Sequence, residues 1–330
     1  DMGYIARFRW VATGDREGCM FLVCGEALYD LFMEPAAGFD LRFDGRIGGS
    51  PFNVAVGLAR LGRPAALFTG LSTDFLGRRL AAALAADGVD TGFLLRKDAP
   101  TTLSLVGLTV DGVPDYAFYG RGAADRSVEI AELPRLDGDV TALHFGSFSL
   151  VVRPAGDAFA ALAARESRRR LISVDPNVRL NVEPDLEVWR SRVAALAVHA
   201  DLIKVSSEDP GALYPGRPIE ALAGQWLGGG VRLVVVTRGA EGAVAFTGRD
   251  RVAIPGEAVA VVDTVGAGDA FQAALLCALD ELGHASRAGL ESLDEPALGR
   301  CLAFATRAAA ITCTRRGAAL PMRRELPSLS

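Results

Sequence analysis

Apolar and polar positions follow two alternating periods along most of this chain. Short apolar runs, typical of buried strands, are followed by segments in which apolar residues recur every three or four positions, typical of helices. The expected strands are Phe21–Cys24, Ala65–Thr69, Val140–Phe145, Leu171–Asp175, Leu202–Val205 and Val231–Thr237. The expected helices are Phe52–Leu61, Phe75–Ala86, Ala155–Arg168, Leu186–His199 and Ile219–Leu227. Strands that alternate with helices predict an α/β fold, a parallel sheet with helices on both faces.

Two stretches interrupt this alternation. Residues 27–47 have no helical period, and residues 101–119 indicate a hairpin around Asp111-Gly112, a strong turn signal between apolar runs. We expect these stretches to join as a small second sheet. A further hairpin is predicted from Ala243–Phe246 and Arg251–Ile254.

The segment of residues 1–19 stands apart, because it has no clear period and no continuous apolar core of a signal peptide. We interpret it as an N-terminal extension, open to being non-native through an over-long start-site assignment. No internal repeat or flexible linker follows. We therefore expect one domain over residues 20–325, with the small sheet inserted in it, and a tail of residues 326–330.

Composition narrows the class of protein. The 330 residues are 50% hydrophobic and carry a net charge of −5, so no basic field for nucleic acid or an acidic membrane is expected. Apolar runs stay shorter than a membrane span. Five scattered cysteines favour reduced thiols in a cytoplasmic protein, and three histidines lack the spacing of metal ligands.

Residues 263–271 read Asp-Thr-Val-Gly-Ala-Gly-Asp-Ala-Phe, and a helical apolar face begins at Phe271. The glycines thus stand where a loop enters a helix N-terminus, a place that binds phosphate through unpaired N–H groups. Asp269 beside it is suited to take a proton from an attacking hydroxyl. Together these features indicate phosphoryl transfer to an alcohol. The alternative is a plain turn with a carboxylate that the helix dipole stabilises.

This nine-residue string resembles the C-terminal signature of the ribokinase (PfkB) family of carbohydrate kinases. The chain lacks the G-x-x-x-x-G-K-[ST] string of P-loop enzymes, so another type of phosphate site is needed. The resemblance implies a three-layer α/β/α fold with a mainly parallel sheet. It also implies a β-sheet lid over the sugar site, built from segments near 27–47 and 101–123.

A second string, residues 48–53, reads Gly-Gly-Ser-Pro-Phe-Asn and is similar to the family's N-terminal signature, closest to the fructokinase subgroup. Paired glycines let a ligand approach the backbone, and an Asn amide offers both a donor and an acceptor. The resemblance implies that Asp30, Gly48, Gly49 and Asn53 bind sugar hydroxyls.

Two arginines are further candidates for the sugar site. Arg179 ends the string Asp-Pro-Asn-Val-Arg of residues 175–179, which recurs in fructokinase-like and ketodeoxygluconate-kinase-like members, although a surface role is equally compatible. Arg121 follows Gly120, whereas many fructokinases carry Arg directly after Phe-Tyr. This shift leaves the sugar open between a ketohexose, ribose and 2-keto-3-deoxygluconate.

Residues 204–209 resemble the family's Lys-x-Asn-x-x-Glu segment, whose acid organises magnesium through water. Here Ser206 replaces Asn and Asp209 takes the place of Glu, with Glu208 adjacent. The resemblance implies that Lys204 and Ser206 contact ATP and that Glu208 or Asp209 serves Mg²⁺. Without the resemblance, two acidic residues at a helix start would indicate only that their charges are stabilised by the helix dipole.

The remaining nucleotide residues also follow from the resemblance. Thr237, Gly239 and Gly242 form the Thr-x-Gly-x-x-Gly turn that lines the phosphates and ribose, and Gly268 contacts ATP. The N–H groups around Gly266, Ala267 and Gly268 stabilise the transferring phosphoryl group. Asp263 matches a monovalent-cation loop, which suggests K⁺.

The resemblance implies an ATP-dependent kinase that phosphorylates a primary hydroxyl of a ketohexose, first of all D-fructose to fructose 6-phosphate. Its ligands would be a small sugar and ATP. Whether the protein forms a homodimer is left open by the sequence. One alternative from another class is a catalytically silent sensor of nucleotide or sugar. Another is a dinucleotide oxidoreductase, but the first strand is not followed by G-x-G-x-x-G.

Overall fold

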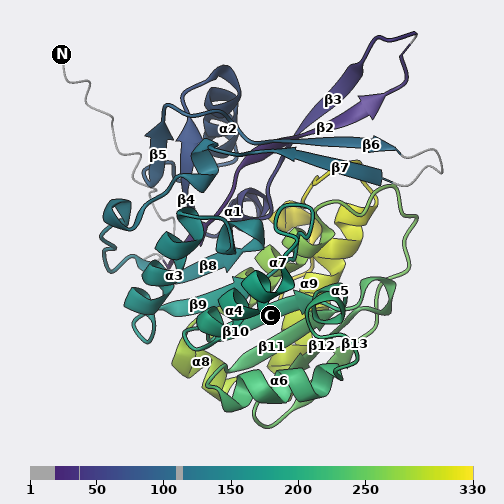
Figure 1. The fold of residues 1–330 in the computed structure, drawn as a ribbon. Coiled ribbons are helices and arrows are strands. Elements are labelled where there is room, and N and C mark those ends of the chain that lie inside the picture. The colour runs from purple at the N-terminus through teal and green to yellow at the C-terminus, as the bar shows by residue number, and fades with distance from the viewer. Residues whose placement is uncertain (1–18, 37, 109–113, 330) are drawn as a thin grey trace.

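A computed structural model describes residues 19–36, 38–108 and 114–329 of the chain (Figure 1). A large sheet and a smaller sheet share this part of the molecule. The strands of the large sheet are β1 (Met20–Cys24), β4 (Ala65–Ser72), β5 (Leu94–Lys97), β8 (Val140–Gly146), β9 (Leu171–Asp175), β10 (Leu202–Ser206), β11 (Leu233–Thr237), β12 (Ala243–Phe246) and β13 (Arg251–Ile254). Their spatial order is β13-β12-β11-β10-β9-β8-β1-β4-β5, parallel from β5 to β11 and antiparallel beyond.

Helices cover both faces of this sheet, as the alternating sequence pattern predicts. The helices are α1 (Ser50–Arg60), α2 (Phe75–Ala86), α3 (Ala155–Glu166), α4 (Leu186–Ala197), α5 (Glu208–Leu213), α6 (Ile219–Gly228), α7 (Ala267–Glu281), α8 (Arg287–Ser292) and α9 (Glu295–Cys313). The short 3₁₀ helices are η1 (Ala124–Arg126), η2 (Ile130–Glu132), η3 (Ser147–Leu150), η4 (Gly239–Glu241) and η5 (Arg323–Glu325).

Two apolar clusters fill the space on either side of the sheet. One joins α1, α2, α7, α8 and α9 to one face, and the other joins α3 to α6 to the opposite face. The fold is therefore the three-layer α/β/α arrangement that the ribokinase-like pattern predicts. Leu326 and Leu329 belong to the first cluster, so the expected tail packs against the domain.

The smaller sheet projects from one edge of the large one (Figure 1). It contains β2 (Leu28–Glu34), β3 (Arg42–Gly48), β6 (Leu103–Leu108) and β7 (Pro114–Tyr119), in the order β3-β2-β6-β7. Strands from two distant segments thus join in one sheet, as expected, because β2 pairs with β6 in parallel. The turn expected at Asp111-Gly112 lies outside the described residues, as does the extension expected at residues 1–19, except residue 19.

Strand order reverses between β1 and β8, since β4 lies on one side of β1 and β9 on the far side of β8. In open α/β sheets the crevice at such a switch point, beyond the carboxyl ends of the strands, binds ligands. The loop after β1 leads directly into the lid strand β2. The smaller sheet therefore begins next to the switch point.

Some boundaries differ from the expected ones. Helix α9 and the short elements β5, α5 and α8 were not delimited from the sequence, because their apolar periods are short or merge with flanking residues. The strand expected to begin at Val231 begins at Leu233. The residue before it, Arg232, donates its backbone N–H to the carbonyl of Asp201.

Candidate active site

The predicted anion-binding loop ends where α7 begins. Gly266 precedes the helix with a φ of 78°, in the left-handed region that glycine adopts without strain. A Cβ at Gly266 would lie 2.6 Å from that of Ala318, so packing also excludes a side chain. Gly268 in the first turn is exposed. The loop thus presents backbone donors at the positive end of a helix dipole, an arrangement that binds phosphate.

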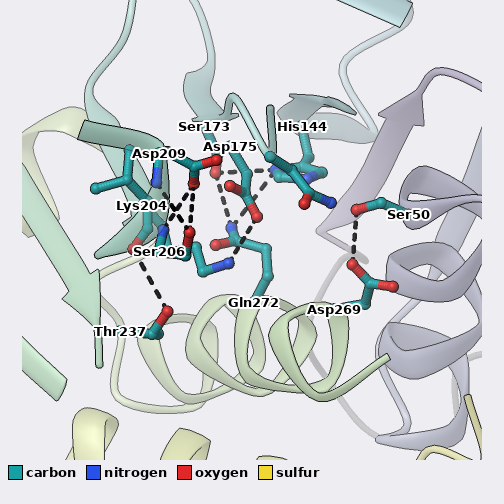
Figure 2. Close-up of polar contacts among 12 residues, drawn as sticks. Ser50, His144, Ser173, Asp175, Lys204, Ser206, Asp209, Thr237, Asp269 and Gln272 are labelled. Carbon is teal, nitrogen blue, oxygen red and sulfur yellow. Dashed lines mark hydrogen bonds and ion pairs between the residues drawn. The ribbon is translucent and has the colours of Figure 1, made fainter. Parts of the chain in front are cut away.

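Asp269 lies in the first turn of α7 and is 8% exposed. Its Oδ1 accepts a hydrogen bond of 2.6 Å from the hydroxyl of Ser50, and its Oδ2 accepts one of 2.8 Å from Nδ2 of Asn53. Both donors come from the first turn of α1, and Figure 2 shows the bond from Ser50. Helices α1 and α7 approach closely because Gly57 faces Ala273, where a Cβ would lie 2.7 Å from the methyl group. The tertiary structure thus joins the predicted base to a predicted sugar ligand.

The two glycines before α1, Gly48 and Gly49, allow the start of the smaller sheet to lie close to the first turn of α1. Gly49 has a φ of 105°, and a Cβ there would lie 2.7 Å from the carbonyl oxygen of Glu26. A Cβ at Gly48 would overlap Oδ2 of Asp30, which belongs to the lid strand β2. Glycine at both positions is therefore a steric requirement. Asp30 thus lies beside Gly48, and the N–H of Asn53 bonds to the carbonyl of Gly49; the binding of sugar hydroxyls by these residues stays a prediction.

Charges also link Asp30 to its predicted neighbours. Burial raises the pKa of Asp30, the hydroxyl of Ser104 and the guanidinium of Arg179 lower it, and the carboxylate of Asp269 raises it. Arg179 itself is exposed and donates to the carbonyl of Val178 at 3.0 Å. The charge of Arg179 thus acts on Asp30, one of the residues predicted to bind the sugar.

Arg121 follows β7 and is exposed. A different arginine, which sequence reasoning missed, occupies the space that Gly120 leaves. A Cβ at Gly120 would lie 2.6 Å from Cζ of Arg126, and this Cζ stands 5.0 Å from the centre of the Phe148 ring. The sequence signal for this contact was Gly120 itself, because a residue without a side chain leaves room for the guanidinium of Arg126.

Lys204 lies below the anion-binding loop. Its Nζ donates to Oδ2 of Asp175 at 2.8 Å, and both side chains are buried (Figure 2). A Cβ at Gly268 would lie 3.3 Å from this Nζ. Burial lowers the pKa of Lys204, but the carboxylates of Asp175, Asp209 and Asp269 outweigh burial and raise it. The result is a fixed ammonium charge directly behind the loop.

The two candidate magnesium acids differ in their surroundings. Both oxygens of Asp209 accept bonds from the protein, 2.7 Å from the N–H of Val178 and 2.8 Å from both the N–H and the hydroxyl of Ser206. Glu208 is exposed at the start of α5. Of the pair, Glu208 has the side chain that suits a hydrated cation, since Mg²⁺ usually retains several waters.

The predicted phosphate turn follows β11. Thr237 ends the strand, and its carbonyl accepts a 2.8 Å bond from the N–H of Ser207, so the ends of β10 and β11 are tied together. Gly239 and Gly242 have φ angles of 54° and 88°, which glycine adopts freely. The turn thus lies at the carboxyl edge of the parallel sheet, next to the segment of Ser206.

Asp263 connects the loop before α7 with the loop after α9. Its Oδ1 accepts from the N–H of Val265 at 3.0 Å, and its Oδ2 from the N–H of Gly317 at 2.8 Å. Among residues 19–36, 38–108 and 114–329, no group of three His, Cys, Asp or Glu side chains could hold a metal ion. A cation here would thus take most of its ligands from backbone carbonyls, water or phosphate.

A buried row of polar side chains that joins α7 to β8 and β9 was not predicted. Nδ1 of His144 lies 3.1 Å from Oγ of Ser173, which accepts a 2.9 Å bond from Nε2 of Gln272 (Figure 2). Burial, assisted by the charge of Lys204, lowers the pKa of His144 to about 3. His144 is therefore neutral in the folded protein.

A second unpredicted cluster lies at the root of the lid. The hydroxyl of Ser149 donates to Oε2 of Glu26, and that of Thr102 donates to Oδ1 of Asp125 at 2.6 Å. Burial raises the pKa of Glu26 to about 7 and that of Asp125 to about 6. These bonds tie the connection from β1 to β2 to η3, and the connection from β5 to β6 to η1. Their separation in sequence left no local signal.

A glycine loop at a helix N-terminus, and a carboxylate in the first turn of that helix that is bonded to a hydroxyl and an amide, suit a phosphotransferase that acts on an alcohol. The chain matches the pfkB family carbohydrate kinases over residues 23–325. It is 41% identical over 279 residues to a fructokinase from Rhizobium leguminosarum bv. trifolii, covering 84% of this chain and 85% of that protein.

Solved structures agree with the sequence match. A fructokinase from Xylella fastidiosa with bound ATP superposes with a TM-score of 0.85 at 29% identity, covering 93% of this chain and 96% of that one. A fructokinase double mutant from Vibrio cholerae O395, in fructose, ADP and potassium ion bound form, has a TM-score of 0.78 at 26% identity and covers 91% and 94%. The chain belongs to the pfkB family of carbohydrate kinases.

Proposed function

We propose that this protein is an ATP-dependent fructokinase, which converts D-fructose and ATP to fructose 6-phosphate and ADP. The observation that carries the proposal is the hydrogen bond from Asn53 to Asp269. It joins the proposed general base, next to the anion-binding loop, to a residue proposed to bind the sugar. The fructokinase names of the relatives support fructose as the sugar.

In the proposed reaction, Asp30, Gly49 and Asn53 hold the sugar beneath the lid. Asp269 orients the C6 hydroxyl and accepts its proton as the hydroxyl oxygen bonds to the γ-phosphorus. The bond from phosphorus to the β–γ bridging oxygen breaks and ADP leaves. N–H groups around Gly266 and Gly268 stabilise the charge on the transferring phosphoryl group.

The remaining nucleotide and cation roles are part of the same proposal. ATP phosphates lie near Lys204, Ser206, Thr237, Gly239 and Gly242. Glu208 would hold Mg²⁺, which would supply neutralisation of the charge on the ATP oxygens. Asp263 and the neighbouring backbone carbonyls hold K⁺, an ion named in the Vibrio cholerae structure.

The test is ADP release by purified protein with MgATP and a panel of sugars. We expect the highest kcat/KM with D-fructose, and fructose 6-phosphate as the product. A higher kcat/KM with 2-keto-3-deoxygluconate or ribose would reassign the sugar. ATP binding without turnover of any sugar would favour a sensor instead.

We also propose a homodimer formed through the lid hairpin. Phe39, Leu41 and Phe43 are exposed at its outer end, and β3 is the edge strand of the lid. Two copies of β3 paired antiparallel about Phe43 would place Arg42 opposite Asp44, so the charges match. Sedimentation should give a dimer that Phe43→Asp converts to a monomer, whereas a monomeric wild type would refute the proposal.

Within the described residues, no helix is long and apolar enough to cross a membrane. Five cysteines are free thiols. These thiols support the proposal that the protein works in the reducing cytoplasm. Titration with a thiol reagent after denaturation of freshly isolated protein should therefore detect all five.

A further inference from the structure

The carboxylate of Asp269 is held by two donors of different chemistry. The hydroxyl of Ser50 binds Oδ1 and the amide of Asn53 binds Oδ2. Ser50 and Asn53 are 8% and 7% exposed, so both bonds form away from bulk water. Hydrogen bonds to charged groups are strongest in such surroundings.

The two donors differ in their freedom to move. Ser50 is the first residue of α1 and stands between Gly49, with its φ of 105°, and Pro51, whose ring restricts φ. Its side chain is short, so the hydroxyl stays close to Oδ1. Asn53 has a longer side chain that carries both a donor and an acceptor, and it is the one of the two that we propose to bind the sugar. A sugar hydroxyl that engages Asn53 therefore approaches Oδ2.

We propose that Ser50 is a positioning residue for phosphoryl transfer, which holds Oδ1 of Asp269 so that Oδ2 receives the proton of the sugar hydroxyl. This inference rests on the proposed kinase function and adds a residue that itself contacts neither sugar nor ATP. The proton moves to Oδ2 as the hydroxyl oxygen bonds to the γ-phosphorus. ADP departs with the electron pair of the broken P–O bond.

Other charges act on the same carboxylate and stay in place when Ser50 is changed. They are Lys204 on β10, Asp175 on β9 and Asp30 on β2. A change in the pH dependence of a Ser50 variant therefore reports the hydroxyl. Loss of a donor disfavours the charged carboxylate, so the acidic limb of the kcat profile should move to higher pH.

The experiment compares the wild type with Ser50→Ala and Ser50→Thr. For Ser50→Ala we expect kcat to fall by about tenfold to a hundredfold, the range of one hydrogen bond to a charged group. The KM values for sugar and ATP should change by less than about twofold, because Ser50 binds neither. Ser50→Thr retains a hydroxyl and should recover much of kcat and the wild-type pH profile.

Ser286→Ala is the matched control, since Ser286 caps α8 by accepting from Gly289 and has no part in the site. It should reduce the thermal midpoint without altering the kcat profile. If Ser50→Ala retains the wild-type kcat and acidic limb, or if Ser286→Ala produces the same changes, the positioning role is refuted.

A second readout is independent of turnover. The ¹³C carboxyl resonance of Asp269, identified by its loss in Asp269→Asn, should shift in Ser50→Ala but not in Ser286→Ala, because only the first variant removes a donor from this carboxylate. An unchanged resonance would overturn the inference even for an active enzyme. Absence of wild-type turnover with every sugar would instead refute the proposed function, while this resonance would still decide the role of Ser50.

Discussion

Nζ of Lys204 lies 2.8 Å from Oδ2 of Asp175, and the two side chains are 4% and 1% exposed. This ion pair joins β10 to β9 directly behind the first turn of α7. Lys204 is one of two lysines in the chain. The negative charges of Asp175, Asp209 and Asp269 raise the pKa of its ammonium group. Such a buried pair is costly to break, because the remaining partner stays charged and without solvent.

Lys204→Met should therefore destabilise the protein by about 3–5 kcal/mol, as expected for removal of one partner of a buried pair. Urea unfolding measures this loss. The double variant Lys204→Met/Asp175→Asn should lose less than the sum of the single variants. Arg307→Met, in the half-exposed pair with Glu257, is the control and should cost less than about 1 kcal/mol. Additive losses would contradict the coupling.

Gly48→Ala should impair sugar binding selectively. Its methyl group would overlap the carboxylate of Asp30, so the lid strand or the sugar loop must shift. We expect the KM for sugar to rise by about tenfold or more, since a small misplacement of binding groups has large effects, with ATP affinity nearly unchanged. Steady-state kinetics and calorimetry measure both. Gly138→Ala, which meets no atom within 4 Å, should behave like the wild type.

Asp269→Asn should retain ATP binding but reduce kcat by about 10²–10⁴-fold, as expected for loss of a general base. ADP release and ATP titration calorimetry separate the two effects. Asp280→Asn, near the other end of the same helix, is the matched control and should keep turnover within about twofold. Near-normal ADP release from Asp269→Asn would remove the base from the mechanism.

Glu26→Gln should stabilise the protein at alkaline pH. Because burial raises the pKa of Glu26 from 4.5 to about 7, the folded state holds a proton that the unfolded chain has lost. Wild-type stability therefore falls as pH rises from about 4.5 to about 7, by about 3 kcal/mol in total, and stays lower above that range. Glutamine has no such dependence.

Thermal midpoints at pH 5 and pH 8 test this expectation. The difference between Glu26→Gln and the wild type should grow toward pH 8 in favour of the variant. Glu220→Gln on the exposed start of α6 is the control and should show no such trend. A difference independent of pH would contradict a protonated Glu26.

Much of the fold could be predicted because its signals are local. Helix α2 and strand β9 have the bounds that their apolar periods indicate, Phe75–Ala86 and Leu171–Asp175. Gly266 was expected at a helix start, and it has the left-handed conformation there. The two lid segments were expected to share one sheet, as β2 and β6 do.

The candidate site was predicted only in part. The segments that carry Asp30, Asn53 and Asp269 were recognised from short strings, and the structure brings them together. The neutral His144 and the acids at the root of the lid were not recognised as clusters. Their partners lie on other strands and loops, so sequence spacing carries no trace of the contact.

By itself, the sequence determined most of the strands and helices of the large sheet and the glycine turns that lead into helices, because period and backbone preference act over a few residues. Only the tertiary structure decided which side chains meet. Ser50 reaches Asp269 across 219 residues because α1 and α7 pack closely at Gly57. That packing depends on shape complementarity between distant elements, which no local pattern encodes.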